Sequence, residues 1–199
     1  MDAEQIWAVE EGEVRKPGVI HIVITALMIG IGAVVGAFGS FSFPLGFGVN
    51  FFWPAIAVQN IGGIWFGLWG VVAAALFPII SNVGTPIYVS LAYIPANAIQ
   101  SLLPAWAFRN FKGDPRLKSG RDWAIFLISI TVANIIGALY STLVVLKGFG
   151  LLTADSVPLF MWGWFGGNEV AGIIFGVILL KALSSVVITT NAFVKKWWA

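Results

Sequence analysis

The residues best suited to chemistry stand at the start of the last long apolar segment. Trp162 and Trp164 precede the pair Asn168-Glu169, and the chain then stays apolar almost to Leu183. A carboxylate in a membrane span costs several kcal/mol unless it meets a polar cavity or a partner. A carboxylate beside indoles suits a cationic or ring-bearing molecule. We therefore expect this group of side chains to contact a small-molecule ligand.

More polar side chains lie on the two preceding apolar segments. Tyr93, Asn97 and Gln100 follow at i, i+4 and i+7, so a helix presents them on one face. Asn134 and Tyr140 lie on the next segment. Polar groups that converge from several helices, with apolar walls between them, are typical of a small-molecule pocket.

Each of these side chains also has a structural interpretation. The amides of Asn97, Gln100 and Asn134 could instead join helices, at about 0.6 to 2 kcal/mol for each hydrogen bond. A carboxylate in a first helical turn gains about 0.3 to 1 kcal/mol from the helix dipole, which applies to Glu169. The tryptophans would also fit an aromatic belt at the membrane surface.

The composition indicates the class of protein. Of the 199 residues, 59% are hydrophobic and 10% are charged, and the mean hydropathy is +0.92. Soluble domains are about 25% charged, so we expect an all-α integral membrane protein. The absence of cysteine excludes disulfides and thiolate metal sites, and the single histidine, His21, excludes a histidine cluster. We expect no metal and no cofactor.

The apolar segments predict six membrane spans. The block from Phe51 to Val83 is 33 residues long, and as one helix it would reach about 50 Å against a hydrocarbon core of about 30 Å. We therefore divide it at the amides and glycines of residues 59–63. The second span is then expected to be short and to end at this break, and the other five are expected at about 18–38, 64–80, 87–108, 123–146 and 161–190. Residues 39–50 are expected to be a loop that folds back onto the protein.

The positive charges predict the orientation. Nine of the 11 Lys and Arg residues lie in the amino tail, in residues 109–122 or in the carboxy tail. Because basic segments remain in the cytoplasm, both termini are expected inside the cell, in a multi-pass protein of the cell membrane. The expected divisions are a cytoplasmic amino tail at 1–16, one six-helix domain at 17–194 and a cytoplasmic carboxy tail at 195–199. The net charge of +2 thus reflects topology, and no nucleic-acid partner is expected.

Lys181 follows Glu169 by 12 residues, about 18 Å along a helix. A lysine in the last span is typical of retinal proteins, where it forms a Schiff base with the ligand. Two features argue against this role: six spans are expected in place of seven, and the first five spans contain no carboxylate to act as counter-ion. We expect Lys181 to extend toward the cytoplasmic face or to bind backbone carbonyls.

Three stretches carry a resemblance to known families: FWPAIAVQNIGGIWFGLWGVVAAALFPIISN, YIPANAIQSLLPAWAFRNFK and WGWFGGNEVAGIIFGVILL. They resemble the S components, the substrate-binding membrane subunits of energy-coupling factor vitamin transporters. They are also similar to the MASE1 and vitamin-uptake-like membrane sensor domains, in which a Gly-Asp stands where this chain has Gly167-Asn168-Glu169. The resemblance implies six helices and an outward pocket between spans 4, 5 and 6, closed by the loops after spans 1, 3 and 5.

The resemblance also implies a partner surface on the first span. Ala26 and Gly30, and Ala33 and Ala37, are small residues spaced by four, which permits close helix approach in a bilayer. S components use such a strip to meet a transmembrane coupling subunit that works with ATPase subunits. Packing within the chain is the alternative.

No enzyme motif is present: the chain lacks a Ser-His-Asp set, HExxH and GxxxxGK[ST]. We expect a substrate-capture subunit of a vitamin or micronutrient uptake transporter and not an enzyme. A chain that ends shortly after its last span favours this over a MASE1-like sensor, which is normally fused to a kinase or cyclase. An accessory structural subunit of a larger membrane complex is the other alternative.

Overall fold

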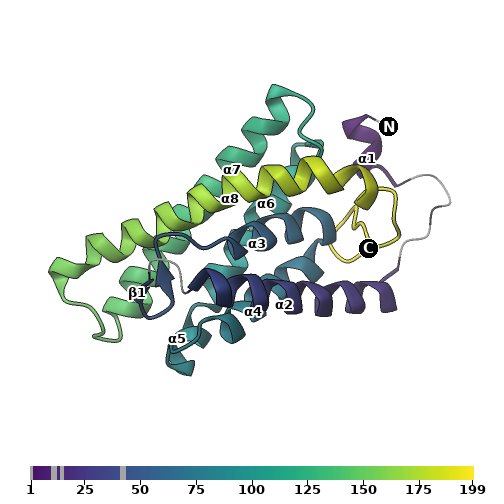
Figure 1. Cartoon of the computed structure of the whole chain (residues 1–199). Coiled ribbons are helices and arrows are strands. Elements are labelled where there is room, and N and C mark those ends of the chain that lie inside the picture. Colours follow the sequence, from purple (N-terminus) through teal and green to yellow (C-terminus); the bar gives the residue numbers. More distant parts are fainter. Residues whose placement is uncertain (1, 10–12, 14–15, 41–43) are drawn as a thin grey trace.

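Helices form most of the chain in the computed structural model, which describes residues 2–9, 13, 16–40 and 44–199 (Figure 1). In this described part, three helical segments are long and apolar enough to cross a membrane: Val19–Gly39, Gly120–Lys147 and Ala154–Val187. The predicted helical, membrane-compatible character is therefore confirmed. The elements are α1 (Ala3–Trp7), α2 (Val19–Ser40), β1 (Pro44–Gly46), β2 (Val49–Asn50), α3 (Ala55–Phe66), α4 (Leu68–Ser81), α5 (Ile87–Ala92), α6 (Ile94–Asn110), α7 (Gly120–Leu139), the π-helical η1 (Tyr140–Lys147), the 3₁₀ turn η2 (Ala154–Ser156) and α8 (Val157–Val187).

The turn between the second and third apolar helices lies at Gly67, and the prediction of a break at residues 59–63 was wrong. Gly67 has a φ of 57° and ends α3, a conformation that glycine adopts without steric cost. The expected breakers serve close packing instead. The side chain of Gln59 donates to the carbonyl of Ala74 at 3.0 Å, and a Cβ on Gly70 would lie 2.0 Å from the carbonyl oxygen of Gly62. The resulting α3 and α4 have 12 and 14 residues, shorter than the roughly 20 that cross a bilayer.

The other predicted helices are present with shifted ends. The expected helix over 87–108 is divided at Tyr93 into α5 and α6, because Pro95 has no N–H and would clash with the carbonyl of residue 91. Ser119 and Asp122 form a capping box that starts α7 at Gly120. A proline in its first turn starts α8 at Val157, before the expected Met161.

One end of the molecule gathers both terminal segments and the α6–α7 loop (Figure 1). The guanidinium of Arg109 donates to the carbonyls of Val194 at 2.7 Å and of Gly63 at 3.0 Å, and also to that of Lys196. Lys195 pairs with Glu13 at 3.0 Å. The three segments that carry most of the basic residues therefore lie together at this end.

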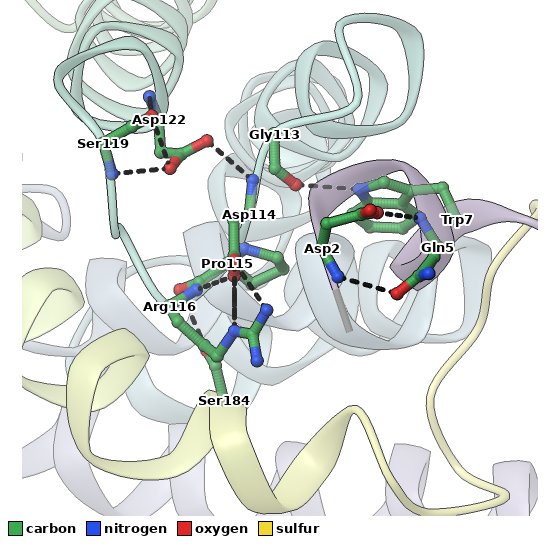
Figure 2. Close-up of polar contacts among 10 residues, drawn as sticks. All are labelled: Asp2, Gln5, Trp7, Gly113, Asp114, Pro115, Arg116, Ser119, Asp122 and Ser184. Carbon is green, nitrogen blue, oxygen red and sulfur yellow. Dashed lines mark hydrogen bonds and ion pairs between the residues drawn. The ribbon is translucent and has the colours of Figure 1, made fainter.

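Hydrogen bonds order the α6–α7 loop at the same end (Figure 2). The indole of Trp7 donates to the carbonyl of Gly113 at 2.7 Å and holds α1 against the loop, where Trp7 is buried. The carboxylate of Asp122 accepts from the backbone N–H of Asp114 at 2.8 Å. Burial opposes the charge of Asp114, but the hydrogen bonds and the charge of Arg116, 2.7 Å away, outweigh it and lower the pKa of Asp114.

The hairpin of β1 and β2 lies toward the opposite end of the molecule, where α8 begins (Figure 1). A Cβ on Gly163 would lie 2.2 Å from the Leu45 side chain, and one on Gly167 would lie 2.3 Å from the carbonyl oxygen of Asn50. The glycines of α8 thus let the hairpin backbone approach the helix closely. For residues 44–50 the predicted return onto the protein is confirmed, although part of this segment is a short sheet. Residues 39–40 belong to α2, and 41–43 lie outside the described residues.

Candidate functional site

Four asparagines line one small pocket beside the hairpin. Asn50 comes from β2, Asn82 ends α4, Asn97 lies in the first turns of α6 and Asn168 lies on α8. All four are at most 8% exposed. We call the space that they line the asparagine pocket; its wall residues are Gly48, Val49, Asn50, Trp53, Pro78, Asn82, Asn97, Trp164 and Asn168.

The asparagine pocket is small and carries no charged side chain among its wall residues. Its volume is about 20 Å³, enough for one water molecule. The Nδ2 of Asn97 is buried without a hydrogen-bond partner among the described residues, and so is the indole Nε1 of Trp164. An unpaired buried donor costs about 1 to 3 kcal/mol, so Asn97 and Trp164 each carry a hydrogen-bond donor that the fold itself does not use.

Three of the predicted site residues line this pocket: Asn97, Trp164 and Asn168. Tyr93 stands behind Trp164, with ring centroids 4.9 Å apart, and its hydroxyl donates to the carbonyl of Phe47 at 3.0 Å. Tyr140 packs against the buried apolar cluster that contains Tyr93 and Trp164.

The structure separates Trp162 from the pocket. Its side chain is 63% exposed and lies with Ile135, Leu139 and Phe165 in an apolar groove between α7 and α8. This position fits the aromatic-belt interpretation, since the helix turns Trp162 to the outer face while Trp164 points inward.

Glu169 also lies outside the pocket wall, in the seam between α7 and α8. Its carboxylate accepts from the Thr131 hydroxyl at 2.5 Å and from Asn134 Nδ2 at 2.7 Å. The side chain of Gln100 donates from α6 to Asn134 Oδ1 at 2.9 Å. The structure thus joins Gln100, Asn134 and Glu169 in one chain of hydrogen bonds across α6, α7 and α8. Gln100 and Asn134 therefore join helices to one another, the structural alternative to a role in ligand binding.

Sequence reasoning missed Asn50, Asn82, Trp53 and Thr131. The first two stand in segments predicted as loops, where a polar side chain carries no periodic signal. A hint was available, because Asn50 directly precedes the apolar block that starts at Phe51, and Asn82 is an amide at the end of that block.

Lys181 donates to the carbonyl of Leu117 at 3.3 Å and lies over the ring of Trp123 at 5.6 Å. The prediction that it binds a backbone carbonyl is confirmed.

The small residues of α2 divide between two faces. A Cβ on Gly32 would meet Phe77 at 2.5 Å and one on Gly36 would meet Ser81 at 2.7 Å, so these two pack inside the chain. In the predicted strip, Ala26 and Gly30 are exposed, whereas Ala33 and Ala37 are half-buried.

Comparison of the chain with known protein families, curated proteins and solved structures gives no match.

Proposed function

We propose that this protein is a multi-pass protein of the cell membrane that captures a small polar molecule in the asparagine pocket. The observation that carries the proposal is the convergence of four amides and two indoles from separate elements, with buried donors that have no partner within the described chain. Amides donate and accept without net charge. The ligand that fits them is a neutral molecule with several hydrogen-bonding groups, and not the cation that Glu169 suggested.

The place of such a binder in an uptake system rests on the resemblance to S components. In support, the wall includes Asn50 from the hairpin after α2 and Asn82 from the turn after α4, and these correspond to two of the loops expected to close the pocket. A ligand of vitamin size needs more room than 20 Å³. The hairpin therefore moves away from α8 to admit it.

The proposed partner is a transmembrane coupling subunit with its ATPase subunits. Ala26 and Gly30 are exposed on α2, and no atom lies within 4 Å of a Cβ built on Gly30. Small side chains allow a partner helix to approach closely. This face of α2 is the proposed docking surface.

Replacing Asn97 with Ala should remove one hydrogen bond to the ligand and weaken binding by about 1 to 1.5 kcal/mol, roughly five- to tenfold. Small molecules that copurify with the protein in detergent are first identified by mass spectrometry, and their affinity is then measured by calorimetry. Asn110→Ala is the matched control, because Asn110 is exposed at the far end of the same helix. Equal affinities for both variants would remove Asn97 from the site.

The same purification separates the alternative functions. A ligand together with co-isolated ATPase subunits supports the uptake component, and a ligand together with a kinase or cyclase supports a sensor. If no molecule copurifies and none of a panel of vitamins raises the thermal unfolding temperature, the accessory subunit is the better description.

The topology predicts that the α6–α7 loop is cytoplasmic and the η2 turn external. The chain has no cysteine, so single cysteines can be placed at the exposed residues Lys118 and Ala154. In intact cells, a membrane-impermeant maleimide should label a cysteine at 154 and spare one at 118, and permeabilised cells should show both. The reverse pattern, or equal labelling in intact cells, would contradict the six-span arrangement with cytoplasmic termini.

A further inference from the structure

An apolar groove runs between α6 and α7, and its volume is about 460 Å³. We call it the α6–α7 groove and define it by the residues Leu103, Trp106, Ala124, Ile128, Val132 and Arg121. Trp106, Ile128 and Val132 are 40% to 64% exposed. The groove therefore opens toward the surroundings of the protein and not toward its core.

Arg121 is the one charged residue among the described residues that line this groove. It is the second residue of α7, and its guanidinium donates to the carbonyl of Phe111, directly after the end of α6. The hydroxyl of Ser129, a polar group farther along the wall, donates to the carbonyl of Phe126 at 3.0 Å. The wall is thus apolar along its length and positive at the end where α6 and α7 are joined.

The α6–α7 loop adds positive charge at the same end. Its two acids are buried and turned inward: Asp114 pairs with Arg116 at 2.7 Å, and Asp122 accepts from the backbone N–H groups of Asp114 and Ser119 (Figure 2). The exposed charged residues of the range 109–122 are all basic, namely Lys112, Lys118 and Arg121. The neighbouring α1 exposes Asp2 and Glu4, but neither lines the groove. The charge at the end of the groove therefore suits an anion.

The length of the groove matches one leaflet of a bilayer. Val132 follows Arg121 by 11 residues on α7, about 16 Å along the helix. The hydrocarbon core is about 30 Å thick, so one leaflet contributes about 15 Å. Arg121 lies in the first turn of a segment that is long and apolar enough to cross a membrane. The guanidinium then lies at the level of the lipid head groups, and Val132 lies near the middle of the bilayer.

We propose that the α6–α7 groove binds one acidic phospholipid, with an acyl chain along the groove and the phosphate at Arg121. The planar guanidinium can donate two parallel hydrogen bonds to phosphate oxygens. Lys112 and Lys118 attract the same negative head group, as basic pockets between membrane helices do. In the proposed topology this lipid belongs to the cytoplasmic leaflet.

A second groove provides an internal comparison. It lies between α7 and α8 and includes Ile135, Leu139, Trp162 and Phe165. Its volume is about 250 Å³, and its described wall residues carry no charge. Acyl chains of any lipid fit this second groove equally, whereas the α6–α7 groove has a physical reason to select a negative head group.

This inference goes beyond the proposed function, because the lipid site exists whether or not the asparagine pocket binds a ligand. Only the assignment to the cytoplasmic leaflet depends on the proposed topology, and the cysteine labelling described above tests that separately. The lipid experiments use protein in detergent, where neither the topology nor a pocket ligand affects the result.

Native mass spectrometry of the whole chain tests the head-group preference. The protein is incubated with equal amounts of phosphatidylglycerol and phosphatidylcholine that carry identical acyl chains. One bound phosphatidylglycerol per chain should exceed bound phosphatidylcholine at least fivefold, and Arg121→Gln should lower this preference about fivefold, the effect of one basic residue near an anionic head group. The control Lys147→Gln, at an exposed lysine of η1, should leave the preference unchanged. Equal binding of the two lipids, or an unchanged preference in Arg121→Gln, would overturn the proposal.

Filling the groove tests the position of the acyl chain. Ala124→Trp should abolish retention of phosphatidylglycerol, whereas Leu139→Trp, in the second groove, should not. If Ala124→Trp does not fold, phosphatidylglycerol with a photoreactive acyl chain is used with the unmodified protein, and the cross-linked peptides should come from α6 and from residues 121–132 of α7. Cross-links spread evenly over all the helices, or displacement of the lipid by soluble glycerol phosphate, would contradict binding of the chain in the groove.

A second copy of the protein is the competing occupant of the groove. The chain has no cysteine, so Ile128→Cys places a single thiol in the exposed wall. Oxidation of this variant in membranes should leave it monomeric, because a lipid covers the wall. Disulfide-linked dimers would show that the groove is an interface between copies and would overturn the lipid site.

Discussion

Replacing Arg109 with Met should detach both terminal segments from the helical bundle and cost about 3 to 5 kcal/mol of the free energy of unfolding. Arg109 is 7% exposed, and within the described part of the chain its guanidinium donates only to backbone carbonyls. Removing it takes a donor from each of these carbonyls, of which that of Gly63 keeps the backbone N–H of Gly67, and a buried carbonyl left without any donor costs about 1 to 3 kcal/mol. The carbonyls belong to Gly63, Ala105, Val194 and Lys196.

The planar fork of Arg109 explains why charge alone is not sufficient. The guanidinium also lies over the rings of Trp7 at 5.0 Å and Trp197 at 5.3 Å, so it joins α1 to the carboxy-terminal segment. A lysine at this position keeps the charge but cannot serve several carbonyls in one plane. Arg109→Lys is therefore expected to lose most of the stability that Arg109→Met loses.

Thermal unfolding in detergent and limited proteolysis measure this effect. Both Arg109 variants should unfold at lower temperature and release the carboxy-terminal segment to protease. Arg121→Met is the control, because Arg121 is exposed and bonds to one carbonyl, that of Phe111. Variants of Arg109 as stable and as resistant as this control would show that the terminal segments are held by other contacts.

Replacing Gly70 with Ala should force α3 and α4 apart. The new Cβ would lie 2.0 Å from the carbonyl oxygen of Gly62 and 2.7 Å from the backbone nitrogen of Gly63, and backbone atoms cannot move aside as a side chain can. Overpacking typically costs about 1 to 3 kcal/mol, and the separation also breaks the hydrogen bond from Gln59 to Ala74. The expected loss is at or above the upper part of this range.

Gly30→Ala is the matched control for Gly70→Ala. Gly30 is also helical, but it is exposed and its Cβ would meet nothing within 4 Å. Alanine should then raise stability by up to about 1 kcal/mol through its higher helix propensity. Opposite changes in unfolding temperature for the two variants are expected. A neutral Gly70→Ala would mean that the crossing of α3 and α4 is looser than its geometry indicates.

Composition and helical spacing are enough to recognise a helical, membrane-compatible protein and to place α2, α7 and α8 within a few residues. These signals are local, because a long apolar run is helical whatever its neighbours are. The same spacing placed Asn97 and Gln100 on one buried face of α6, and the distribution of Lys and Arg grouped the two tails with residues 109–122, which lie at one end.

Which groups each side chain contacts depends on how distant segments pack together. The spacing of residues along the chain does not predict these contacts. Gly62 and Gly63 look like turn residues, yet they serve a backbone crossing because Gly70 comes to lie against them. Glu169 stands next to tryptophans in the chain, but the rotation of α8 turns it to Thr131 and Asn134. The asparagine pocket likewise exists only because hairpin and helix ends that are distant in sequence meet at one place, where the close approach of backbones at glycines decides which amides face each other.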